Sequence, residues 1–112
     1  MIEASELIRI HGDVEIVDIA SNSGSGQAVS RCPECRIALW SNYAAAKGAV
    51  HFVKIGTLDN PDEFPPDIHI FTASKQPWVK LEGGAPVVAE YYQAADIWSG
   101  ENMARYRRAL GK

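Results

Sequence analysis

Two cysteines are the residues of this 112-residue chain whose type and spacing point most clearly to chemistry. Cys32 and Cys35 are the only cysteines in the sequence, and Pro33 and Glu34 separate them. A thiolate pair at this spacing folds back as a tight turn and holds one edge of a tetrahedral zinc ion. A structural zinc normally takes four protein ligands, and this sequence has no second pair. The pattern therefore predicts half of a zinc site.

A redox-active disulfide is an alternative role for two cysteines at this spacing, as in thioredoxin-like proteins. That chemistry needs the pair at the start of a helix that follows a buried strand. Residues 37–40, Ile-Ala-Leu-Trp, are instead typical of a strand. An inert pair is the third alternative, and metal binding is the interpretation that we favour.

The composition is that of an ordinary soluble globular protein, with 46% apolar and 22% charged residues. The length suits one domain with its own core and is too short for two. A formal net charge of -3 speaks against a nucleic-acid partner, because neutralising phosphates requires clustered Lys and Arg. No apolar stretch approaches the ~20 residues that span a bilayer. We therefore expect no membrane association and a cytoplasmic location.

Short runs of β-branched and aromatic residues between turn residues predict a mainly β domain. The expected strands cover residues 13–20, 27–31, 37–43, 50–56 and 68–72. The polar, glycine-rich stretch 21–26 predicts a loop between the first two strands, so that the second strand leads into the cysteine pair. The proline-containing stretch 59–67 predicts the loop before the last strand.

The C-terminal part has helical character. Ser99 is suited to be an N-cap, and Gly111 is suited to end the helix. The predicted apolar face of this helix consists of Met103, Tyr106 and Leu110. A further helical turn is predicted between residues 91 and 98. The sequence therefore predicts a short amphipathic helix of about three turns at the C-terminus.

Two segments form a long, ordered pattern beside the cysteine pair. They are residues 56–61, Gly-Thr-Leu-Asp-Asn-Pro, and residues 68–78, Ile-His-Ile-Phe-Thr-Ala-Ser-Lys-Gln-Pro-Trp. Together they closely resemble the signature of the glutathione-dependent formaldehyde-activating enzyme (GFA) family, also called the CENP-V/GFA domain. Cys32 and Cys35 lie where that family has its later Cys-x-x-Cys pair. The resemblance implies a β-tent fold of the Mss4-like type, in a single domain over residues 1–112.

The resemblance also implies a chemistry. In the family, a Cys-x-Cys pair near the N-terminus joins the later Cys-x-x-Cys pair in a structural Cys₄ zinc site. A separate Cys-x-Cys-x-x-Cys motif holds a second zinc with three thiolates and an open position for glutathione or another thiol. The family reaction forms and cleaves a carbon–sulfur bond, joining glutathione and formaldehyde as S-hydroxymethylglutathione. By resemblance, the chain is a carbon–sulfur lyase.

The cysteine ligands of that catalytic zinc have no counterparts in this chain. The resemblance covers roughly the last two thirds of the family domain and begins near residue 5, after the five N-terminal cysteines. Arg36 stands where the family usually has Gly, which takes a left-handed conformation at little cost. Without those cysteines, the alternative function is a non-catalytic zinc-binding scaffold or assembly domain.

Three explanations fit the missing ligands. The chain is a fragment or a product of a truncated start, or it is a natural short member that kept the scaffold. Alternatively, two copies each contribute Cys32 and Cys35 across a two-fold axis and complete a Cys₄ zinc in a homodimer. In every case zinc is the expected cofactor, in a structural role.

Four residues of the matching motif are candidates for a pocket that holds a glutathione-like thiol: His69, Ser74, Lys75 and Trp78. Ser74 and Lys75 suit a carboxylate of such a substrate, or else they belong to a turn at the end of a strand. His69 suits a pocket or a structural hydrogen bond. For Trp78 we favour burial in the core over a place in a pocket wall.

Overall fold

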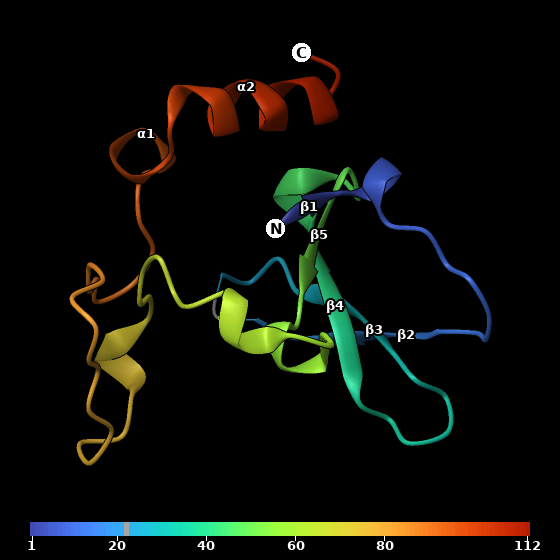
Figure 1. Ribbon diagram of the computed structural model, residues 1–112, viewed down its shortest axis with the longest axis horizontal. Coiled ribbons are helices and arrows are strands. Elements are labelled where there is room, and N and C mark those ends of the chain that lie inside the picture. Colours follow the sequence, from blue (N-terminus) through green and yellow to red (C-terminus); the bar gives the residue numbers. More distant parts are fainter. Residues whose placement is uncertain (22) are drawn as a thin grey trace.

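A five-stranded antiparallel sheet organises the fold in a computed structural model that describes residues 1–21 and 23–112. The strands are β1 (Ile2–Glu3), β2 (Glu15–Ile19), β3 (Gln27–Arg31), β4 (Ala38–Tyr43) and β5 (Val50–Val53). They lie in the order β1-β5-β4-β3-β2, as the ribbon in Figure 1 shows. The prediction of a mainly β domain with a short C-terminal helix is confirmed.

The predicted strands around the cysteine pair agree with the observed ones. The strand predicted for residues 27–31 has the same bounds as β3, and its neighbours are shorter than predicted by one to three residues at their ends. The predicted strand 50–56 stops at Val53 because residues 55–57 close a 3-10 turn. Of the loop predicted at residues 21–26, Asn22 lies outside the described residues.

The strand predicted for residues 68–72 is wrong. Only an isolated parallel bridge between His69 and Val87 forms there, and residues 72–74 are a 3-10 turn. Phe71 has a left-handed backbone with φ 53°, which ends any extended run. The segment does have a partner, since backbone hydrogen bonds join residues 69–73 to residues 86–90, but the left-handed backbone at Phe71 keeps the two segments from continuing as a regular ladder.

Two helices follow, α1 (Ala94–Ile97) and α2 (Gly100–Ala109). As predicted, Ser99 caps α2, since its Oγ accepts a hydrogen bond of 3.1 Å from the Asn102 N–H. Gly111 has a φ of 77° just past the end of the helix. Arg105 donates two hydrogen bonds, of 2.9 and 2.8 Å, to the Glu3 carboxylate and so ties α2 to strand β1. Among the described residues, none of the helices has the length and apolarity needed to cross a membrane.

The buried part of the molecule lies in the middle of the sheet. Among the described residues, the buried apolar side chains are Val29, Ala46 and Val50, and the buried polar ones are Ser30 and Ser41. The Ser41 hydroxyl is enclosed and has no hydrogen-bond partner in the part of the chain that the structure describes. This core is small for a chain of 112 residues.

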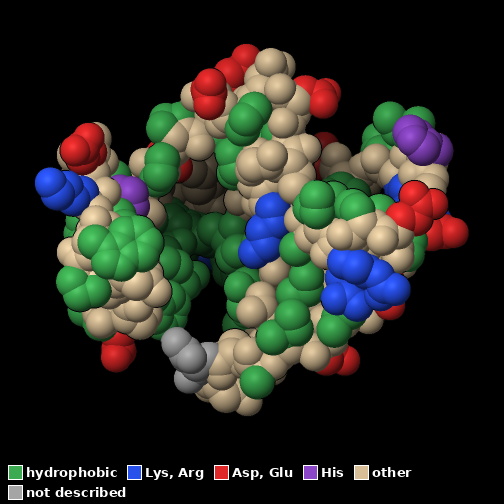
Figure 2. Space-filling model, turned by 90° about the horizontal axis from the view of Figure 1, so that it is seen from below, with side chains coloured by type: hydrophobic (Ala, Val, Ile, Leu, Met, Phe, Trp, Pro, Cys, Tyr) green, Lys and Arg blue, Asp and Glu red, His purple; other side chains and the backbone are tan. Residues whose placement is uncertain are grey.

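The chain exposes much more surface than a compact monomer of its mass. Its accessible surface is 8491 Å², about 2,400 Å² above the roughly 6,100 Å² expected at 12.2 kDa. The radius of gyration is 15.2 Å, against about 13 Å for a compact domain of this length. Figure 2 shows the cause on one face, where hydrophobic side chains line a deep hollow.

Candidate metal centre

The cysteine pair lies in a closed turn between β3 and β4. The Cys32 N–H donates to the Ile37 carbonyl at 3.0 Å, and the Arg36 N–H donates back to the Cys32 carbonyl at 2.9 Å. These two bonds close the turn at residues 32–37, so the two cysteines lie at the tip of the hairpin between β3 and β4. We call residues 32–37 the knuckle.

Arg36 takes the left-handed conformation that the resemblance assigns to a glycine. Its φ is 65°, a conformation that costs an L-residue roughly 1–2 kcal/mol. The Arg36 side chain offsets part of this cost, since its Nη1 donates to Glu15 Oε2 at 2.8 Å. The turn geometry therefore survives the replacement of glycine.

Glu15 joins the knuckle to the sheet. Its Oε2 accepts hydrogen bonds of 2.8 Å from Arg31 Nε and from Arg36 Nη1, so one carboxylate on β2 holds β3 and the end of the turn. The hydrogen bond from Arg31 and the charges of both guanidiniums lower the pKa of Glu15. The sequence analysis missed this cluster, because nothing in the spacing of the three residues signals that they meet across strands.

The two thiols differ in environment. Cys32 is half-buried and Cys35 is exposed, and both are free. The backbone N–H groups of Cys35 and Glu34 lower the pKa of the Cys32 thiol, because they donate to its sulfur and stabilise the thiolate. Zinc binds the thiolate, and a lowered pKa of Cys32 favours that form of its sulfur.

The donor set fits half of a tetrahedral zinc site. Among the described residues, no group of three or more His, Cys, Asp or Glu side chains is arranged to hold a metal ion. His51 is engaged elsewhere, since its Nδ1 lies 2.9 Å from the Asn42 amide and its ring packs at 5.2 Å from the ring of Trp40. A zinc ion bound by both cysteines of the knuckle would keep two positions for ligands from outside the described residues.

The four predicted pocket residues lie on one segment, residues 69–78, and none of them lines the hollow described below. His69 is half-buried, and its Nε2 is enclosed without a hydrogen-bond partner among the described residues. Ser74 is exposed and its Oγ donates to the Phe71 carbonyl at 3.1 Å, while Lys75 reaches the neighbouring Gln76 carbonyl at 3.5 Å. The interpretation of Ser74 and Lys75 as part of a turn agrees with these contacts.

The expected burial of Trp78 in the core is wrong. Trp78 is 77% exposed. Residues 75–78 follow the 3-10 turn on the yellow and orange arm in Figure 1, which extends away from the sheet. An indole usually buries much apolar area, but this arm packs against too little of the chain to cover it.

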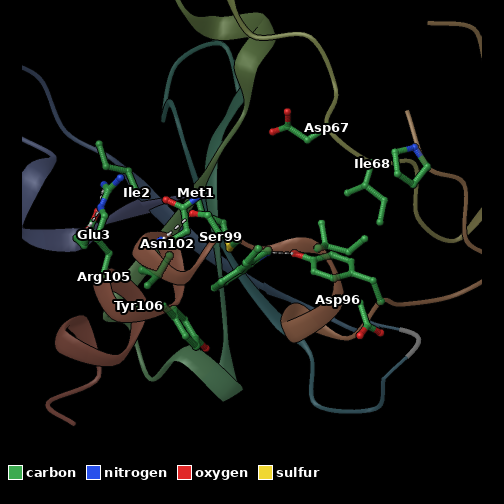
Figure 3. A pocket seen from close by; sticks show the side chains of 15 residues that line it. Met1, Ile2, Glu3, Asp67, Ile68, Asp96, Ser99, Asn102, Arg105 and Tyr106 are labelled. Atoms are coloured by element: carbon green, nitrogen blue, oxygen red, sulfur yellow. Dashed lines mark hydrogen bonds and ion pairs between the residues drawn. The ribbon is translucent and has the colours of Figure 1, made fainter. Parts of the chain in front are cut away.

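A hollow lies elsewhere, between β1, the arm and the two helices. Figure 3 shows its walls, with a volume of about 800 Å³. The aromatic part of its wall consists of Tyr92, Trp98 and Tyr106, with the Trp98 ring between the rings of the two tyrosines. The Trp98 indole N–H donates to the Tyr92 hydroxyl at 3.0 Å. The helical spacing predicted Tyr106 on the inner face of α2, but nothing in the sequence indicated the hollow.

The chain is thus a small, mainly antiparallel β domain with a Cys-x-x-Cys turn between two neighbouring strands. The family model described as glutathione-dependent formaldehyde-activating enzyme (GFA) matches residues 1–74 of this chain. That range contains all five strands and the knuckle, and the chain belongs to this family. No curated protein and no solved structure that was compared matches the chain significantly.

Proposed function

We propose that the chain is a zinc-binding assembly domain of the GFA family, in which Cys32 and Cys35 of two copies hold one structural zinc. The observation that carries this proposal is the closed knuckle, which offers two thiolates and has no third ligand beside it among the described residues. A second copy supplies the same pair again, which restores the four thiolates of a structural site. Zinc in such a site fixes two chains together and leaves no open position for a substrate.

The charges beside the knuckle neither favour nor oppose four thiolates on one zinc. Four thiolates around Zn²⁺ carry a net charge of about -2. In each copy, Arg31 and Arg36 carry two positive charges, and Glu15 and Glu34 carry two negative ones. The charge of Glu34 also raises the pKa of Cys32. Reduced thiols are maintained in the cytoplasm, and we propose that the protein acts there.

Cobalt(II) titration tests the proposal, because tetrahedral cobalt reports its thiolate ligands through its visible absorption. The expected result is a tetrathiolate spectrum that saturates at one cobalt per two chains. Cys35→Ser abolishes that spectrum, whereas Glu34→Gln, in the same turn, retains it. Saturation at one cobalt per chain, or no thiolate spectrum, would contradict the proposal.

The family match favours a second candidate, a carbon–sulfur lyase acting on the glutathione adduct of formaldehyde. In that function His69, Ser74 and Lys75 would contact the thiol substrate, with Trp78 at the edge of the site. Against it stands the lack of three clustered metal ligands in the described residues.

An assay of S-hydroxymethylglutathione formation with zinc supplied separates the two candidates. The assembly domain gives no rate above the spontaneous reaction. A rate above it that Cys32→Ser abolishes would instead establish the lyase.

A further inference from the structure

The hollow between β1, the arm and the two helices has an aromatic corner in its wall, formed by Tyr92, Trp98 and Tyr106. The Trp98 ring lies 5.2 Å from the Tyr106 ring with their planes at 89°, and 6.5 Å from the Tyr92 ring with their planes at 50°. All three side chains are half-buried. The aromatic corner thus presents ring surfaces to the hollow from different directions (Figure 3).

The charged side chains that line the same hollow are mostly acidic. They are Glu3, Asp67, Asp96 and Arg105. Arg105 donates to both carboxylate oxygens of Glu3, so these two charges cancel. Asp67 and Asp96 are exposed, and neither forms an ion pair with any of the described residues. Two uncompensated carboxylates therefore stand at the rim of a hollow with an aromatic wall.

We propose that this hollow is a binding site for a small organic cation, an ammonium ion that carries alkyl groups. A cation of this kind is attracted to the faces of aromatic rings, and its alkyl groups pack against them. The carboxylates of Asp67 and Asp96 add attraction from the rim. The volume of about 800 Å³ is within the range of small-molecule sites. Residues 32–37 do not line the hollow, so this site is separate from the knuckle.

The charges favour a cation over the other possible occupants. An anion would meet the two unpaired carboxylates, and the cationic side chain in the wall, Arg105, is already engaged by Glu3. A protein surface that covered the hollow by apolar contact alone would bury Asp67 and Asp96 without compensation, which is costly. A small ammonium ion satisfies both the rings and the carboxylates.

An NMR titration of the zinc-loaded protein with choline tests the proposal. The probe is the indole N–H resonance of Trp98, which donates to the Tyr92 hydroxyl in the wall of the hollow. Trp98→Phe identifies it among the resonances of the three tryptophans. We expect choline to shift this resonance until it saturates. The uncharged analogue of choline, in which carbon replaces the nitrogen, should bind at least about tenfold more weakly.

A second comparison tests the carboxylates. We expect Asp67→Asn combined with Asp96→Asn to raise the dissociation constant of choline at least about threefold. Asp13→Asn combined with Asp18→Asn is the matched control. It removes the same charge from exposed positions before and within β2, at the opposite edge of the sheet from β1, and leaves the constant unchanged.

Three results would overturn the proposal. They are equal binding of choline and its uncharged analogue, an equal loss of affinity in the two aspartate variants, and a Trp98 resonance that choline does not shift. The site does not depend on the shared zinc, so Cys32→Ser should bind choline as the unmodified chain does. Backbone amide spectra of each variant verify that the fold is intact.

Discussion

At the scale of single residues, the backbone of the knuckle determines the surroundings of Cys32. The knuckle keeps its closed hydrogen bonds and its N–H donors toward Cys32, although Arg36 occupies a left-handed position. The cysteine pair, and Arg36 in place of a glycine beside it, are visible in the sequence. It did not predict that Glu15, on a different strand, would hold that residue in place.

Substitutions at position 36 measure the backbone cost of the knuckle. We expect Arg36→Gly to be more stable than Arg36→Ala by about 1 kcal/mol, because both lose the ion pair with Glu15 and only Ala keeps the strain at positive φ. Urea unfolding of the two variants provides the comparison. Equal unfolding free energies would show that the turn is not left-handed at this position.

A second prediction concerns His51. Burial lowers its pKa below the usual value of 6.5, and the Asn42 amide donates to its Nδ1, so the folded protein favours the neutral ring. The stabilisation is therefore fully present above pH 6.5 and is lost as the pH falls through the lowered folded pKa. We expect the unfolding free energy to decrease between pH 7.5 and 5.5, and His51→Gln to reduce that decrease.

His11→Gln is the control for this titration, because His11 is exposed in the loop before β2. This variant should retain the pH dependence of the unmodified chain. The same slope in the His51→Gln variant as in the unmodified chain would rule out a role for His51.

At the scale of elements, the sequence predicted correctly those features that depend on hydrogen bonds between residues close in sequence. The bounds of β3 and the cap of α2 follow from turn residues and from Ser99, which act within a few positions. The strand expected at residues 68–72 did not form because Phe71 takes a left-handed backbone, which interrupts the pairing of this segment with residues 86–90. Trp78 is exposed although tryptophan is usually buried, since burial depends on what packs against the arm.

Helix α2 depends on its cap because the chain makes few other contacts with it. We expect Ser99→Ala to lower the unfolding free energy by about 1 kcal/mol, since the Asn102 N–H loses its acceptor. Ser99→Asp restores an acceptor and should be close to the unmodified chain. Thermal unfolding followed by circular dichroism distinguishes these results, and no loss in Ser99→Ala would show that the helix is held by other contacts.

At the scale of the whole molecule, the sheet is formed but its surroundings are sparse. Family membership is established by the match over residues 1–74, and the small core and the 8491 Å² of accessible surface are properties of this chain that composition did not reveal. An apolar content of 46% predicts a core, but it does not say how much of that content is covered. A shared metal and a second copy would account for both the unfilled ligand positions and the uncovered area.

Native mass spectrometry of the zinc-loaded protein is the most direct test of this account. It predicts one species with the mass of two chains and one zinc ion, which Cys32→Ser converts to metal-free single chains. A single chain that carries its own zinc, or a dimer that persists without metal in the Cys32→Ser variant, would contradict the shared site.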